Sequence, residues 1–119
     1  MQERRHSGRW EINSRANVKI CNQAQLFNCT IDDINFKGLR LRFPQSINMN
    51  NAAEMHIALG DELFLNIEAA VAWNKADDTD TVYGLFFTRI KDSDKESIYK
   101  FIQKNFAEKI KQQVYRDLV

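Results

Sequence analysis

The stretch that decides the fold runs from residue 63 to residue 73 and reads Leu-Phe-Leu-Asn-Ile-Glu-Ala-Ala-Val-Ala-Trp. Its odd-numbered positions, from Leu63 to Trp73, are all apolar, whereas its even-numbered positions include Asn66 and Glu68. An apolar side chain at every second residue is typical of a β-strand with one face on a core. A strand this long usually bends or is shared by two pairings, as in a small barrel. The stretch therefore predicts a mainly β protein.

Shorter runs with the same alternation lie on both sides of this stretch. In residues 39–43 apolar side chains alternate with Arg40 and Arg42, which the pattern places on the opposite face. Pro44 ends that run because proline cannot donate to a ladder, and the polar residues 76–80 form a hairpin loop. We predict a six- or seven-stranded antiparallel β-barrel over residues 16–92, with strands near 18–21, 27–31, 39–43, 55–59, 63–73 and 82–90.

The C-terminal residues 93–119 change period and predict an α-helix. Ser93 has the character of an N-cap, and Glu96 three residues later would complete a capping box. The apolar side chains then follow steps of three and four residues, the stripe of an amphipathic helix that covers the barrel. Residues off this stripe could contact a second copy of the chain, as in a homodimer, or a partner protein. These residues are Tyr99, Tyr115 and Leu118.

Length, charge and spacing exclude several function classes. The chain has 119 residues, the size of one domain, and its net charge of +1 provides no broad field for DNA. No apolar run is long enough for membrane insertion or for a signal peptide, so we expect a cytoplasmic protein. His6 and His56 are isolated, and the spacing of Cys21 and Cys29 fits no common zinc or redox motif. We expect no enzyme activity, no metal and no cofactor, and two half-buried thiols on neighbouring strands.

The N-terminal residues 1–15 form a locally basic segment, which we interpret as a flexible arm. It carries Arg4, Arg5 and Arg9, and Gly8 would let the chain turn between the last two. The arginine fork fits a phosphate group or the O6/N7 edge of guanine. The alternative is a solvated, nonspecific basic tail.

Residues 33–38 form a second polar feature, at the junction of two predicted strands. Asp33 and Asn35 are two residues apart, so on extended backbone their side chains point to the same side. A carboxylate can accept hydrogen bonds from N1–H and N2–H₂ of guanine, and Gly38 permits a tight turn or a close backbone approach. A plain Asx turn is an equally good interpretation of these residues alone.

Together the two features resemble the PilZ domain family, bacterial receptors for cyclic di-GMP. Arg5 and Arg9 match its Arg-x-x-x-Arg arm, while Asp33 and Gly38 match its Asp/Asn-x-Ser-x-x-Gly motif. Asn35 stands where the family usually has Ser. Residues 72–73, residues 83–87 and the C-terminal helix look like the family's later strands and tail, so the resemblance covers nearly the whole chain. It implies a PilZ-like split barrel.

The resemblance also implies roles for individual residues. The two arm arginines would contact phosphates and guanine edges, and Asp33 and Asn35 would read a guanine. Gly38 would keep the strand entry open, and Arg4, just before the first of the two arginines, favours two stacked ligand molecules. Trp73 continues the inward register of its strand, which predicts core packing, with ligand contact as the alternative. The predicted ligand-binding residues are Arg4, Arg5, Arg9, Asp33, Asn35, Gly38 and, on that alternative, Trp73.

Three functions follow as hypotheses. The first is a cyclic di-GMP receptor whose arm becomes ordered on binding and which signals through an effector protein. The second is a PilZ-like interaction module, related to motility or pili, with weak or no ligand binding. The third is a small RNA- or single-strand-binding barrel, which the near-neutral charge disfavours. Calorimetric titration with cyclic di-GMP separates the first from the other two.

Overall fold

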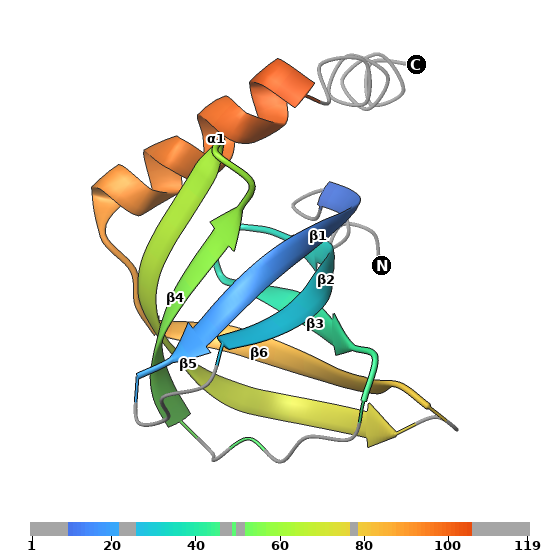
Figure 1. Ribbon diagram of the computed structural model, residues 1–119. Helices are drawn as coiled ribbons and strands as arrows, with labels where there is room; N and C mark the ends of the chain where they lie inside the picture. Colours follow the sequence, from blue (N-terminus) through green and yellow to red (C-terminus); the bar gives the residue numbers. More distant parts are fainter. Residues whose placement is uncertain (1–9, 22–25, 46–48, 50–51, 77–78, 106–119) are drawn as a thin grey trace, which may run out of the picture.

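The computed structural model describes residues 10–21, 26–45, 49, 52–76 and 79–105. Within them the chain forms six β-strands followed by one α-helix (Figure 1). The elements in chain order are β1 (Trp10–Ile20), β2 (Leu26–Ile34), β3 (Gly38–Phe43), β4 (Ala52–Leu59), β5 (Leu63–Ala76), β6 (Thr81–Arg89) and α1 (Asp92–Asn105).

The strands close into a barrel in the order β1-β2-β3-β6-β5-β4. Every neighbouring pair is antiparallel, and closure depends on β1, which pairs with β2 along most of its length and with β4 from Asn17 to Ile20. A closed barrel leaves no sheet edge with unpaired backbone groups. The predicted antiparallel barrel with a C-terminal helix is therefore confirmed.

The core lies inside the barrel and is built from the alternating side chains of every strand. Phe43 is fully buried in it, with edge-to-face contacts to Phe27 at 6.0 Å and to Tyr83 at 6.1 Å between ring centroids. The Tyr83 hydroxyl accepts a hydrogen bond from the Met49 backbone N–H at 3.1 Å, which satisfies a buried polar group. The alternation that predicts β5 holds for Leu63, Leu65, Ile67 and Ala69, all of which are buried.

The first strand begins earlier than the sequence predicts. β1 starts at Trp10, six residues before residue 16, so Arg15 belongs to the barrel and not to an arm. The pairing with β2 shifts register between Glu11 and Ser14, and Asn13 there has a φ of 46°, a conformation that Asn tolerates better than most residues. Polar residues at this bulge weaken the strand signal in the sequence, and pairing with β2 overrides it.

Helix α1 packs beside β5 at one end of the barrel (Figure 1). It begins at Asp92, and the Lys91 carbonyl accepts from the backbone N–H of Lys95, so the predicted cap at Ser93 is wrong. Asp92 and Asp94 in the first turn favour this start because acidic groups stabilise a helix N-terminus. Ile98, Phe101 and Ile102 are buried, which confirms the predicted stripe as far as residue 105; its remaining positions, with Tyr115 and Leu118, lie outside the described residues.

The two cysteines differ in environment. Cys29 is buried in β2, and this burial raises the pKa of its thiol to about 12. Cys21 is exposed directly after β1, so the expectation of two half-buried thiols is wrong. Both are free thiols.

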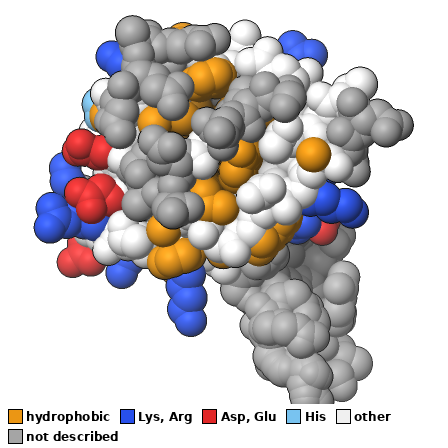
Figure 2. Space-filling view, turned by 90° about the horizontal axis from the view of Figure 1, so that it is seen from below, with side chains coloured by type: hydrophobic (Ala, Val, Ile, Leu, Met, Phe, Trp, Pro, Cys, Tyr) orange, Lys and Arg blue, Asp and Glu red, His pale blue; other side chains and the backbone are white. Residues whose placement is uncertain are grey.

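Charges of both signs are mixed on the surface. Seen from below, apolar side chains show across the middle of the face, with acidic side chains next to basic ones at its margin (Figure 2). Within the part of the chain that the structure describes, no group of acidic, histidine or cysteine side chains could hold a metal ion. In the same residues no helix has the length and apolar character that a membrane span requires.

Candidate functional site

The turn between β2 and β3 is fixed by Asn35. Its backbone N–H donates to the Gly38 carbonyl at 2.9 Å, and its side-chain Oδ1 accepts from the backbone N–H groups of Lys37 at 2.7 Å and Gly38 at 2.8 Å. This is an Asx turn, in which the side chain replaces a backbone carbonyl. The Oδ1 atom that could contact a ligand is thus already engaged in holding the turn. A serine hydroxyl makes the same kind of turn, so Asn in place of Ser is compatible with the motif.

Gly38 opens β3 at a place where the neighbouring backbone comes close. A Cβ on Gly38 would lie 2.1 Å from the Leu85 carbonyl oxygen and 3.0 Å from the Phe86 Cα. Both obstacles are backbone atoms of β6, held in place by the β3–β6 pairing. The Phe87 N–H also donates to the Lys37 carbonyl at 2.8 Å, which ties the turn to β6. Only glycine fits here without separating the two strands.

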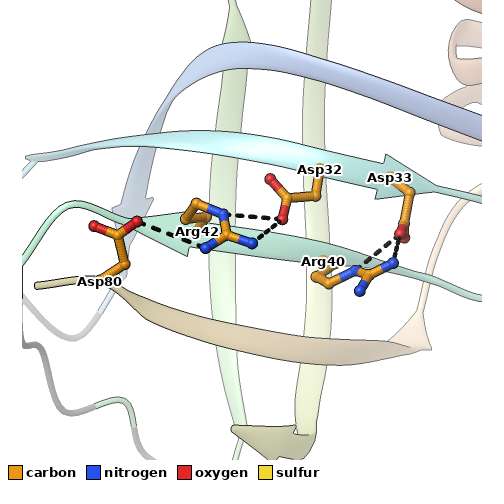
Figure 3. Close-up of polar contacts among 5 residues, drawn as sticks. All are labelled: Asp32, Asp33, Arg40, Arg42 and Asp80. Atoms are coloured by element: carbon orange, nitrogen blue, oxygen red, sulfur yellow. Dashed lines mark hydrogen bonds and ion pairs between the residues drawn. The ribbon is translucent and has the colours of Figure 1, made fainter. Parts of the chain in front are cut away.

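An irregularity in β2 presents two consecutive carboxylates to the outward-facing arginines of β3. The β2–β3 register shifts between Ile31 and Asp33, as in a β-bulge. Asp33 then lies opposite Arg40, whose Nε donates to Oδ2 at 2.8 Å and whose Nη2 contacts the same oxygen (Figure 3). Asp32 accepts from Arg42 at 3.1 Å (Nε) and 3.0 Å (Nη2).

These ion pairs offset the charge of the two arginines. Arg42 also reaches Asp80 at 3.6 Å, and its hydrogen bond to Asp32, with the charge of that carboxylate, raises the pKa of the guanidinium (Figure 3). The Asp33 side chain is only 4% exposed, whereas Arg40 is 34% exposed. A buried carboxylate is costly without a counter-charge, and Arg40 supplies it. This outward face of β3 is therefore not a basic surface.

Trp73 lies on the outside of the barrel, so the prediction that it packs in the core is wrong. The β5–β6 register shifts between Val71 and Trp73, and this bulge reverses the inward parity that the strand keeps as far as Ala69. The indole is 44% exposed and covers Gly84, where a Cβ would lie 2.3 Å from the ring atoms Cε2 and Nε1. The bare backbone of Gly84 lets the ring lie close against β6.

These features meet in one hollow of about 240 Å³ on the outer face of β3, β5 and β6. It brings together Asp33, Asn35, Gly38 and Trp73 from the sequence prediction, and adds Arg40, Gly84 and Phe86. We did not predict Arg40 as a site residue, although its outward position on β3 is visible in the sequence. The arm arginines Arg4, Arg5 and Arg9 lie outside the described residues, so their place at this hollow stays a prediction.

A larger hollow of about 610 Å³ lies over β1, β2 and β3. Its polar lining includes Arg15, Asn28, Thr30 and Arg42. Because none of the predicted ligand-binding residues in the described part of the chain lines this hollow, the smaller one that holds the motif residues is the candidate site.

Comparison with known proteins supports this assignment of the fold. The structure of Bacillus subtilis Inhibitor of motility (MotI/DgrA) is similar, with a TM-score of 0.68 and 14% sequence identity. The match covers 92% of this chain but 54% of the MotI/DgrA chain, so this protein corresponds to about half of that one. A comparison with curated proteins finds no match. The family model of the PilZ domain matches residues 3–104. The chain therefore belongs to the PilZ domain family, whose members are binding modules rather than enzymes.

Proposed function

We propose that this protein is a cyclic di-GMP receptor that binds its ligand in the hollow beside Trp73, with the N-terminal arm closing over it. The observation that carries the proposal is the convergence of Asp33, Asn35, Gly38 and the exposed Trp73 on one hollow. Asp33 and Gly38 match the motif by which the sequence resembles the family, Asn35 stands at the serine position of that motif, and Trp73 reaches the hollow through a bulge. No metal or cofactor is needed for such binding.

The chemistry of the hollow suits a guanine dinucleotide. Trp73 exposes part of an aromatic ring, and base–aromatic stacking contributes about 1–3 kcal/mol per base. Beside it the Asp33–Arg40 pair supplies fixed polar groups that can select among bases. The ligand's two phosphates match Arg5 and Arg9 of the arm, which Arg4 supplements, because arginine forms charge-assisted bonds with phosphate oxygens.

Signalling would follow from the arm. If the arm becomes ordered over the ligand, the bound protein offers an effector a surface that the free protein does not have. An alternative is a PilZ-like interaction module that binds a partner, for example in motility as the MotI/DgrA name suggests, without regard to the ligand. The Asn at position 35 does not favour this alternative, since its side chain caps the turn as a serine would.

Isothermal titration calorimetry with cyclic di-GMP tests the proposal. We expect micromolar or tighter binding by the unmodified protein, and at least about tenfold weaker binding by Arg5→Ala and Arg9→Ala, since charge-assisted hydrogen bonds contribute about 1.5–3 kcal/mol each. Arg89→Ala is the matched control: the Arg89 side chain is 77% exposed, lies outside the hollow and is expected to leave affinity unchanged. Absence of binding by the unmodified protein at micromolar ligand would contradict the proposal.

A further inference from the structure

The polar side of the hollow consists of two joined side chains with very different access to a ligand. Asp33 is the motif residue, but its side chain is 4% exposed and its Oδ2 already accepts from two nitrogens of Arg40. Arg40 is 34% exposed and lines the same hollow. The group presented to a ligand at this position is therefore the guanidinium and not the carboxylate.

The way Asp33 holds Arg40 leaves one edge of the guanidinium available. Arginine has five N–H donors in a planar fork. Asp33 engages Nε and one side of Nη2, and Nη1 has no hydrogen-bond partner among the described residues. The edge formed by Nη1 and Nη2 can still make two parallel hydrogen bonds. Its direction is fixed, because the Asp33 contact and the β2–β3 pairing both constrain the side chain.

We propose that Arg40 is a specificity-determining residue that donates this free edge to O6 and N7 of a guanine, and that Asp33 is the positioning residue that orients it. Bidentate donation to O6 and N7 is the commonest way in which arginine recognises guanine. An adenine presents a donor in place of O6, so the same arginine disfavours it. The inference rests on the proposed function, because it specifies how the same hollow selects its base.

The two assignments of Asp33 depend on different atoms of the ligand. If the carboxylate accepts from the base directly, the exocyclic N2 amino group matters and N7 does not. If Arg40 reads the base, N7 matters and the N2 group matters little at this position. Analogues that lack one atom each therefore separate the two possibilities.

Arg42 provides a matched control on the same strand face. Its side chain is 38% exposed and forms ion pairs with Asp32 and Asp80, much as Arg40 pairs with Asp33. It is not among the residues that line the hollow around Trp73. A lysine at either position keeps the charge and loses the fork.

Calorimetric titrations of cyclic di-GMP and its 7-deaza analogue into the full chain, Arg40→Lys and Arg42→Lys test the proposal. We expect the analogue to bind about tenfold more weakly than cyclic di-GMP to the unmodified protein and to Arg42→Lys. In Arg40→Lys, the affinity for cyclic di-GMP should fall about tenfold. The analogue should then bind less than about twofold more weakly than cyclic di-GMP to this variant. Thermal melting of each variant shows whether it is folded, and Asp33→Asn, which keeps the side-chain shape, should reduce the N7 penalty as well.

The outcomes separate this inference from the proposed function. If the unmodified protein does not bind cyclic di-GMP, the function and the inference both fail. If it binds, but the N7 penalty is the same in Arg40→Lys, the inference is overturned and the function stands. It is also overturned if cyclic di-IMP, which lacks the N2 amino group, binds at least about tenfold more weakly and this penalty disappears in Asp33→Asn.

Discussion

The contact between the Trp73 indole and Gly84 can be broken by one added methyl group, in the variant Gly84→Ala. The new Cβ would lie 2.3 Å from Cε2 and Nε1 and 2.8 Å from Cζ2 of the indole. Favourable contact between such atoms needs about 3.5–4.0 Å, so the ring must move by about 1.2–1.7 Å or adopt another rotamer. The obstacle is a partly exposed side chain, which can give way while the strands stay paired.

The expected effect on stability is modest. Trp73 is 44% exposed, so roughly half of a side chain that can bury up to about 250 Å² contacts the protein. At about 25 cal/mol per Å² this burial contributes at most about 3 kcal/mol, of which only part faces Gly84. Alanine also loses less chain entropy than glycine on folding, by about 0.5–1 kcal/mol. We expect the free energy of unfolding to fall by about 1 kcal/mol, and the affinity for cyclic di-GMP to fall about tenfold as stacking is lost.

Fluorescence and a double-mutant cycle measure this effect. The chain has two tryptophans, so Trp10→Phe makes Trp73 the only one, and its emission should shift to the red in Gly84→Ala. Urea unfolding gives the stability, and titration with cyclic di-GMP gives the affinity. Since both changes act through the same ring, Gly84→Ala should cost no further affinity once Trp73→Ala is present. Independent, additive losses from the two substitutions would refute the reasoning.

Four further predictions concern the strand junction, the turn and the two thiols. Gly38→Ala places a methyl group 2.1 Å from the Leu85 carbonyl oxygen, so we expect a loss of about 3 kcal/mol or more in urea unfolding; unchanged stability would be inconsistent with the close approach. Asn35→Ala should lower stability by about 1 kcal/mol in thermal melts, while Asn35→Ser should retain most of it; equal losses would contradict the capping role. In the native protein at pH 8, a thiol reagent should label Cys21 and not Cys29, because burial raises the pKa of Cys29 to about 12; two reactive native thiols would disprove this. The same burial favours the neutral thiol of Cys29 over the thiolate. The contribution of this thiol to the free energy of unfolding should therefore be lost as pH rises from about 9 towards 12. In alkaline unfolding, Cys29→Ala should lose less stability over this pH range than the unmodified protein.

The sequence by itself determined the barrel, the helix and the motif. Alternation over residues 63–71 is enough to predict a long half-buried strand, because a single face of apolar side chains must find a core. The motif spacing is equally local: Asn35 and Gly38 lie within one turn, and the backbone of that turn positions both. Such features depend on residues that are neighbours in the chain, and this is why they can be read from it.

Only the tertiary structure decided which side chains the site presents. Bulges at residues 31–33 and 71–73 arise from the register in which β2 pairs with β3 and β5 pairs with β6, which the alternation within one strand does not specify, and each changes the face on which the following side chain lies. They bring Trp73 out of the core and align Asp33 with Arg40. Parity along one strand predicts its faces until a neighbouring strand forces an extra residue into the ladder. Arg40 is the exposed member of the pair because the fold buries the Asp33 side chain more deeply. The sequence of one strand does not specify how deeply each side chain is buried.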